Sequence, residues 1–356
     1  MASSCAARPG PSARVAGTAL IAMALGCGRP PTVGPVRFVR GDGPGARTMQ
    51  LAAHPLGTPP PAELLGPADA VHFPAPSGPP GAPTVLIRVG ESPAGHEEQL
   101  LVLEADGRLR TLGPARPRLR APAWAADGGH VVVEAALSGF SDLAVIDLAT
   151  GGHRPLTDLP GGAFTPHISA QGLVAFVGST NGELDLFAVP LSGGPTRPLL
   201  RAPGEDLNPT WSPAGSHLAW ISGRGGVLGL SVLQLADLSV RAVYVPRQAE
   251  TEAIPDQGLA WSPDGRRIAL PLRHQERSCI GIFDAETGQQ IRGPAAGGCP
   301  PGREEGVAWS PDGSMVLTAR TVNGDSDLIA VAADGQAEWL VLGGPSTDWL
   351  PRWDGG

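Results

Sequence analysis

The sequence contains no lysine, so all 26 of its basic residues are arginine, and 34 acidic residues give the chain a net charge of −8. An acidic chain without a basic stripe is poorly suited to neutralise phosphates, which argues against nucleic-acid binding. Charged residues make up only 17% of the 356 residues and hydrophobic residues 42%, so a packed core is expected. The missing lysine also excludes a Ser–Lys catalytic dyad.

Long amphipathic helical patterns are missing as well, which argues against an α/β fold. The chain instead has 50 glycines and 39 prolines, without the Gly-x-y period of collagen. Because glycine and proline mark turns, this composition predicts many short elements joined by tight connections.

The main apolar run, residues 15–25, is too short to cross a bilayer, and it follows Arg8 and Arg14 as the core of a signal peptide does. Gly26 and Cys27 come next, an arrangement that resembles the bacterial lipobox, although Ala24 stands where that motif prefers leucine. Residues 1–26 are therefore predicted to be a lipoprotein signal peptide and Cys27 the lipidated residue. Ordinary signal cleavage after Ala24 and an uncleaved anchor are the alternatives.

Only four cysteines are present, and none has the Cys-x-x-Cys spacing of a zinc site. If Cys5 is removed with the signal and Cys27 carries lipid, Cys279 and Cys299 remain as a pair. In an oxidising compartment we expect them to form a disulfide, which would place the protein outside the cytoplasm. Two free buried thiols are the alternative.

Residues 27–68 are rich in proline and glycine and have little periodic hydrophobicity, so we predict a tether between the lipid and a folded domain at residues 69–356. Within this tether, Val36 to Val39 have the composition of a strand.

A repeat dominates the rest of the chain. The sequence Trp-Ser-Pro-Asp-Gly begins at Trp261 and Trp309, near copies begin at Trp124, Trp211 and Trp353, and a degenerate copy begins at Ile168. The steps between these six positions are 44, 43, 50, 48 and 44 residues. In each unit a short strand ends at the marker, a glycine turn follows, and further strand-like segments complete the unit. Four strands at this period predict the blade of a β-propeller.

The repeated Trp-Ser-Pro-Asp-Gly units resemble those of the TolB-like propeller family over residues 83–356. The resemblance implies an all-β propeller, and our count gives six blades, with the strand ending at Trp353 completing the blade that begins near Thr84. A seventh blade built from Val36 to Phe73 is the alternative. The family resemblance also implies an interaction scaffold in the bacterial cell envelope, here a lipid-anchored monomer, in the periplasm or at the outer membrane, that binds a protein or peptide.

The repeated tryptophans could form an aromatic binding surface, but a large side chain at a fixed position in each blade is more typical of packing between blades. We therefore assign a structural role to Trp124, Trp211, Trp261, Trp309 and Trp353. The aspartate of each marker turn is expected to bind its own loop.

Acidic residues recur in the connections expected on one face of the propeller, and we predict that they form a rim that attracts a cationic partner segment. Loop charges that serve only solubility are the alternative. The predicted rim residues are Glu205, Asp206, Glu304, Glu305, Asp325 and Asp348.

No catalytic motif is present: the Gly-x-Ser-x-Gly nucleophile motif is missing, and of the eight histidines only His167 falls on a predicted first strand. A hydrolase or lyase with its site in the central channel is the alternative to a binding scaffold. No cofactor is predicted. Asp325 and Asp327, which follow Asn323, could form part of a calcium site, although the rest of a calcium loop is missing from the sequence and an ordinary polar turn is the favoured interpretation.

Overall fold

In the computed structural model, the described part of the chain is residues 32–353 without residues 42–46, 56–62, 65–70, 75–78, 80–81, 93–94, 105–107, 117–118, 137–139, 180–181, 202, 225, 247–250, 295–298 and 345–347. The chain divides into two compact units, Met1–Pro30 and Pro31–Gly356, and all described residues belong to the second. The predicted signal peptide and Cys27 lie outside the described residues.

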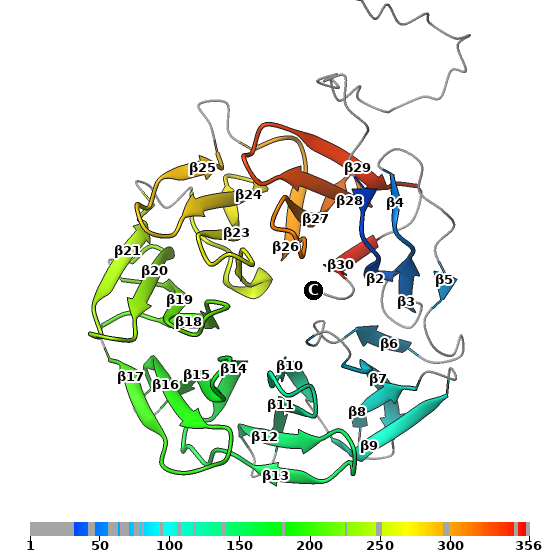
Figure 1. The fold of residues 1–356 in the computed structure, drawn as a ribbon, viewed down its shortest axis with the longest axis vertical. Helices are drawn as coiled ribbons and strands as arrows, with labels where there is room; N and C mark the ends of the chain where they lie inside the picture. The colour runs from blue at the N-terminus through cyan, green and yellow to red at the C-terminus, as the bar shows by residue number, and fades with distance from the viewer. Residues whose placement is uncertain are drawn as a thin grey trace, which may run out of the picture. The chain divides into compact units, whose positions relative to one another are not determined.

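The described strands form seven groups of four, which we call blades 1 to 7 (Figure 1). Blade 1 has the order β30 (Asp348–Trp353), β2 (Val36–Arg40), β3 (Arg47–Leu51), β5 (Glu63–Leu64). Blade 2 contains β6 (Val71–Pro74), β7 (Thr84–Ser92), β8 (Gly95–Leu103), β9 (Leu109–Arg116). Blade 3 contains β10 (Arg120–Trp124), β11 (His130–Ala136), β12 (Ser141–Asp147), β13 (His153–Pro155). Blade 4 contains β14 (Ala163–Ile168), β15 (Leu173–Ser179), β16 (Leu184–Pro190), β17 (Arg197–Leu200).

The last three blades follow the same plan. Blade 5 contains β18 (Asp206–Trp211), β19 (His217–Ser222), β20 (Gly229–Gln234), β21 (Val240–Tyr244). Blade 6 contains β22 (Ala260–Trp261), β23 (Arg267–His274), β24 (Arg277–Asp284), β25 (Gln290–Arg292). Blade 7 contains β26 (Arg303–Trp309), β27 (Met315–Val322), β28 (Asp325–Ala332), β29 (Glu338–Leu342). A single parallel pair, Ser278 with Arg303, joins blades 6 and 7. The remaining elements are the pair β1 (Thr32–Val33) and β4 (His54–Pro55) and the 3-10 turn η2 (Pro255–Gln257).

The strand pairing differs from the predicted six sets. β30 does complete an N-terminal sheet, but it pairs with β2, with Val36 opposite Trp353, and not with the blade that contains Thr84. Residues 36–64 therefore contribute β2, β3 and β5 to a sheet with β30, separate from the sheet that contains Thr84. β1 to β5 also lie inside residues 27–68, so the described part of the predicted tether belongs to sheets. Val36, Phe38 and Val39 are fully buried there, which explains why this proline-rich segment folds.

Tight turns set the register of the blades, as the repeat predicts. In the turn after β22, Asp264 accepts hydrogen bonds from the Ser262 hydroxyl at 2.6 Å and from the Arg266 backbone N–H at 3.0 Å. Gly265 has a φ of 70°, a conformation that glycine adopts without steric cost. Asp312 makes the same bonds in blade 7, so the marker aspartate binds its own loop as predicted.

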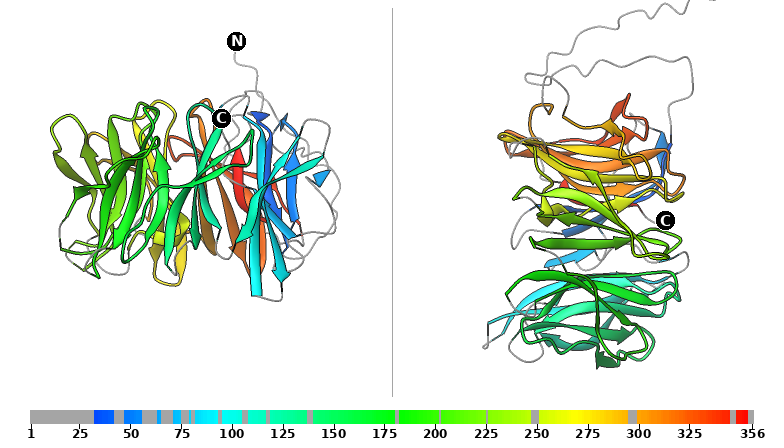
Figure 2. Two further views of the ribbon diagram at one scale, coloured as in Figure 1. Left: turned by 90° about the horizontal axis from the view of Figure 1, so that it is seen from below. Right: turned by 90° about the vertical axis from the view of Figure 1, so that its left-hand side faces the viewer.

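The hydrophobic core lies between neighbouring blades. Val132 and Leu143 of blade 3, for example, belong to one buried cluster with Phe176 and Val189 of blade 4. Each blade is thus apolar on both faces, which suits a stack of sheets arranged around an axis. Figure 2 shows the strands running between two opposite faces, where their turns gather. We call the face that carries the β27–β28 hairpin and the connections between blades the rim face, and the opposite one the marker face.

An arginine near the start of the outermost strand links several blades, a repeat that the sequence analysis missed. Arg110, Arg154 and Arg241 pair with equivalent positions of the preceding strand, Val102, Val145 and Val232. Each donates a hydrogen bond to a backbone carbonyl of the next blade, the acceptors being Leu148, Leu191 and Ala285. These arginines lie 44 and 87 residues apart, close to one and two periods of the repeat, which was a visible signal.

Candidate functional site

The marker tryptophans link adjacent blades at the inner strands. The indole N–H of Trp261 donates to the Thr210 carbonyl at 2.9 Å, and that of Trp309 donates to the Ala260 carbonyl at 3.0 Å. Both acceptors immediately precede the marker of the preceding blade. Trp211 is also buried and Trp124 is half-buried, whereas the side chain of Trp353 lies outside what the structure describes. At Trp261 and Trp309 these contacts agree with a packing role.

The predicted acidic rim divides into exposed and buried members. Glu205 and Asp325 are exposed and Glu305 is half-buried, at or beside the ends of strands that reach the rim face. Asp348 begins β30, and its side chain lies outside the described part of the chain. These residues come from blades 1, 5 and 7, so they are spread over the face and form no single cluster.

Asp206 is a correction to the predicted rim, because its side chain is fully buried. The indole N–H of Trp220 donates to its carboxylate at 2.7 Å, and the Arg224 guanidinium lies 3.6 Å from the other oxygen. Burial raises the pKa of the Asp206 carboxyl, although Trp220 and Arg224 partly oppose this shift. The carboxylate therefore serves the interior of blade 5 and cannot contact a partner.

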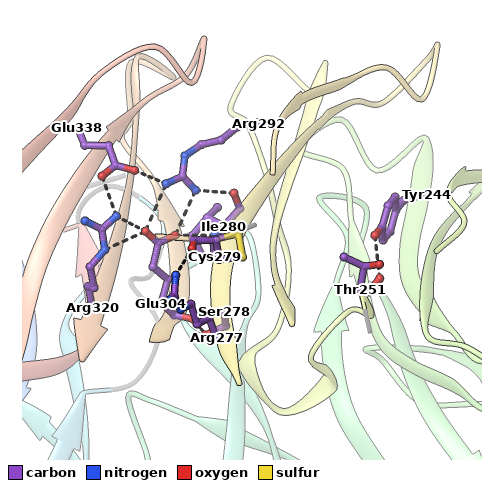
Figure 3. Close-up of a disulfide and its surroundings, with 11 residues drawn as sticks. Tyr244, Thr251, Arg277, Ser278, Cys279, Ile280, Arg292, Glu304, Arg320 and Glu338 are labelled. Carbon is purple, nitrogen blue, oxygen red and sulfur yellow. Dashed lines mark hydrogen bonds and ion pairs between the residues drawn. A yellow bond between two sulfur atoms is a disulfide. The ribbon is translucent and has the colours of Figure 1, made fainter. Parts of the chain in front are cut away.

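Glu304 is the second correction, since it too is fully buried (Figure 3). It accepts a hydrogen bond from the Ile280 backbone N–H at 2.6 Å and forms ion pairs with Arg292 and Arg320. Glu338 binds the same two arginines, at 2.7 Å from Arg320. Burial would raise the pKa of the Glu338 carboxyl, but the two arginines hold it below its ordinary value. The charges of the two acids and the two arginines cancel, so this network presents no net charge. Its ion pairs also join blade 6 to blade 7.

The predicted cysteine pair lies beside this network (Figure 3). The structure joins Cys279 of β24 to Cys299 through a disulfide, and both residues are almost fully buried. Arg277 donates to the Cys299 carbonyl at 3.2 Å. The bridge therefore fixes the connection between blades 6 and 7 next to the buried charges.

A central cavity of about 700 Å³ is lined by the inner strands β10, β14, β18 and β22, with Val307 of β26. Among the lining residues that the structure describes, His167 of β14 is the only ionisable side chain, and none is Asp, Glu or Arg. Its Nδ1 accepts the backbone N–H of Trp211 at 3.2 Å, and burial lowers the pKa of the imidazole to about 4. His167 is therefore neutral at ordinary pH.

Three of the strands lining this cavity share a bulge that the sequence analysis missed. Ala121, Thr165 and Asn208 have φ values of 46°, 47° and 51°, and each precedes a proline. The strand register shifts at each of these positions. The recurrence of a proline two residues before the markers Trp124, Ile168 and Trp211 was the signal that could have revealed the bulge.

The two acids of the turn considered for calcium do not belong to a cluster of metal-ligand side chains among the described residues. Asp325 is exposed, whereas Asp327 accepts a hydrogen bond from the Gly344 backbone N–H at 3.3 Å. Within the described residues, no three His, Cys, Asp or Glu side chains are grouped as metal ligands. In the same part of the chain, no helix is long and apolar enough to span a membrane.

Comparisons with known proteins agree with this geometry. The family model of the TolB beta propeller domain matches residues 85–354. TolB from Acinetobacter baumannii is 19% identical, with a TM-score of 0.55 over 90% of this chain and 83% of that chain. A puromycin hydrolase is 18% identical, with a TM-score of 0.65 over 90% of this chain and 54% of that chain.

An oligogalacturonate lyase solved in complex with manganese is 13% identical, with a TM-score of 0.60 over 88% of this chain and 86% of that chain. At these identities, the similarity to the solved structures shows a shared fold and nothing about activity. No curated protein matches the sequence.

Proposed function

Because the chain belongs to the TolB beta propeller family, we propose that it is an exported, lipid-anchored scaffold that binds a protein or peptide in the bacterial cell envelope. The observation that carries this proposal is the family match over residues 85–354, together with the signal-like N-terminus and Cys27. We further propose that the pairing of β30 with β2 closes the ring of blades, so that the scaffold depends on its C-terminal strand.

The partner-binding surface in this proposal is the rim face, reduced to its accessible acids. The predicted set of six acids is reduced to Glu205, Glu305 and Asp325. Asp206 and Glu304 are left out because they are buried against arginines, and Asp348 because its side chain lies outside the described part of the chain. Unpaired surface carboxylates create a field that speeds the approach of a cationic segment more than it tightens the final complex. The partner is therefore expected to present basic residues.

Binding is favoured over catalysis by the chemistry of the cavity. A general acid or base works best with a pKa near the operating pH, whereas the pKa of His167 is lowered to about 4. The other lining residues in the described part of the chain carry no carboxylate that could complete an acid–base pair. Structural neighbours do include a hydrolase and a lyase, so an enzyme acting from the channel is the second candidate.

The test is a capture experiment followed by association kinetics. The full chain would be used to isolate partners from envelope extract, and the partner retained would be purified. The triple variant Glu205→Gln, Glu305→Gln, Asp325→Asn should then associate several-fold more slowly at low ionic strength. The difference should shrink as salt rises, because the screening length falls to about 8 Å at physiological ionic strength.

The matched control is the triple variant Asp237→Asn, Glu286→Gln, Asp334→Asn. It removes the same charge from exposed turns on the marker face, and asparagine keeps the turn hydrogen bonds at Asp237 and Asp334. Equal slowing by both triple variants would assign the effect to net charge and remove the rim face from the proposal. Failure to retain any envelope protein or peptide would overturn the scaffold function itself.

A further inference from the structure

The central cavity is suited to an uncharged occupant. Among its described lining residues, all side chains are apolar or neutral polar, with His167 as the single ionisable group. A charged ligand would lose its hydration on entry without gaining a countercharge, which is costly in a partly enclosed site. The volume of about 700 Å³ lies in the range of small-molecule sites. The cavity therefore favours a neutral ligand of modest size.

Two side chains give this wall a defined hydrogen-bonding pattern. Since Nδ1 of His167 accepts the Trp211 backbone N–H, the proton of the neutral imidazole lies on Nε2, which has no partner within the described residues. On the neighbouring strand β18, the Asn208 amide donates its N–H to the Pro255 carbonyl. Its amide oxygen is then an acceptor. The cavity thus offers one N–H donor and one carbonyl acceptor on adjacent inner strands.

The three bulges disfavour an extended peptide as this ligand. A peptide that adds to a sheet needs an unbroken row of backbone donors and acceptors on the edge strand. Pro122, Pro166 and Pro209 have no N–H, and the preceding left-handed residues shift the register of β10, β14 and β18. Proline and bulges block strand addition at exposed edges. A compact ligand, contacted by side chains, suits these walls better.

We propose that the cavity binds a neutral saccharide, with His167 and Asn208 as the residues that determine its specificity. A sugar hydroxyl both accepts and donates, so it can accept from His167 Nε2–H and donate to the Asn208 oxygen. The apolar face of a sugar ring can pack on the proline and tryptophan surfaces of the wall, where Trp124 is half-buried. This site is separate from the acids of the rim face and goes beyond the scaffold function.

The first experiment is a glycan array probed with the full chain in a detergent without sugar headgroups. The array would present neutral mono-, di- and trisaccharides beside uronic-acid and glucosamine counterparts of the same linkage. Retention of neutral glycans, with weaker retention of the anionic and cationic counterparts, is the expected result. Retention of charged glycans in preference, or of none at all, would overturn the proposal.

The second experiment assigns the binding to the cavity by calorimetry with the best neutral glycan. His167→Phe, which removes the donor, and Asn208→Leu, which removes the acceptor, should each weaken binding about tenfold. His167→Gln keeps an N–H donor and should retain most of the affinity. His130→Phe on the marker face is the control and should bind as the unchanged chain does.

Folding is separated from recognition by a third variant, Ala126→Glu, which places a charge on an exposed lining residue just after β10 and leaves both hydrogen-bonding residues in place. It should abolish neutral-glycan binding, and the melting temperature of the variant is measured in parallel to show that it folds. Binding unaffected by Ala126→Glu and by His167→Phe would place the sugar elsewhere and overturn the proposal. So would selective binding of an uncharged Ala-Pro peptide in place of any glycan.

Discussion

Pairs of neighbouring acids show what a residue's own sequence position can and cannot reveal. Glu205 is exposed while Asp206 is buried, and Glu305 is half-buried beside the fully buried Glu304. Successive side chains along an extended chain point in opposite directions, so the two acids of each pair meet different surroundings. The sequence predicted that these acids lie at blade ends, but the arginines that neutralise Glu304 come from other strands.

These buried acids lead to a prediction about pH. The pKa of Asp206 is raised on folding, so the folded state holds that proton more tightly than the unfolded state, and Asp206 costs stability as pH rises above its ordinary value of 3.8. The pKa of Glu338 is lowered, so its contribution is present above its ordinary value of 4.5 and is lost as pH falls through the lowered value.

Replacing each of these two carboxyl groups by an amide should therefore change the stability in opposite directions. Relative to the unchanged chain, Asp206→Asn should gain stability between about pH 3 and pH 7, and Glu338→Gln should lose stability over the same range. Urea unfolding at a series of pH values measures both differences. Parallel pH profiles for all three proteins would mean that neither carboxyl has a perturbed pKa.

At the scale of elements, the repeat predicted most inner strands and missed the atypical ones. All six predicted first strands end at their markers, which are Trp124, Ile168, Trp211, Trp261, Trp309 and Trp353. The strands of blade 1 at residues 36–64 were not predicted, because β2, β3 and β5 carry no marker of their own and β5 has only two residues. Its proline-rich connections resemble a linker in composition. Only the pairing of β2 with β30, which is long-range, distinguishes them from a tether.

Removing β30 should test that pairing directly. Deleting residues 348–356 exposes the edge of β2 and uncovers apolar surface between blades 1 and 7. We expect a much lower melting temperature or aggregation, because the lost burial is a large part of a marginal stability. Deletion of residues 354–356 alone, which follow β30, is the control. A chain without β30 that melts like the control would contradict the pairing.

At the scale of the whole molecule, the propeller class and its family were predictable because a 43- to 50-residue period has few structural solutions. The binding surfaces were not, since they depend on which loops and inner strands become neighbours. The cavity illustrates this: its described lining residues include members of blades 3 to 7, and the lack of charge among them appears only once the strands are assembled.

The membrane attachment of the whole molecule is tested at Cys27. Cys27→Ser should abolish fatty-acid labelling and move the protein from the membrane fraction to the soluble fraction after cell disruption. Cys5→Ser, which alters a cysteine inside the predicted signal peptide, should leave labelling unchanged. Persistent labelling of the Cys27→Ser variant would contradict the lipoprotein assignment and leave ordinary secretion or an uncleaved anchor.

The shared sheet of blade 1 also has a consequence for the order of folding. Val36 and Trp353 pair although they lie near opposite ends of the chain, so the loop that this contact closes contains almost the whole protein. Such a contact forms slowly and late. In the proposed export from the N-terminus, β2 and β3 would therefore wait for the last residues to arrive. Their unpaired edge is exposed throughout that interval, which makes blade 1 the segment most in need of a chaperone.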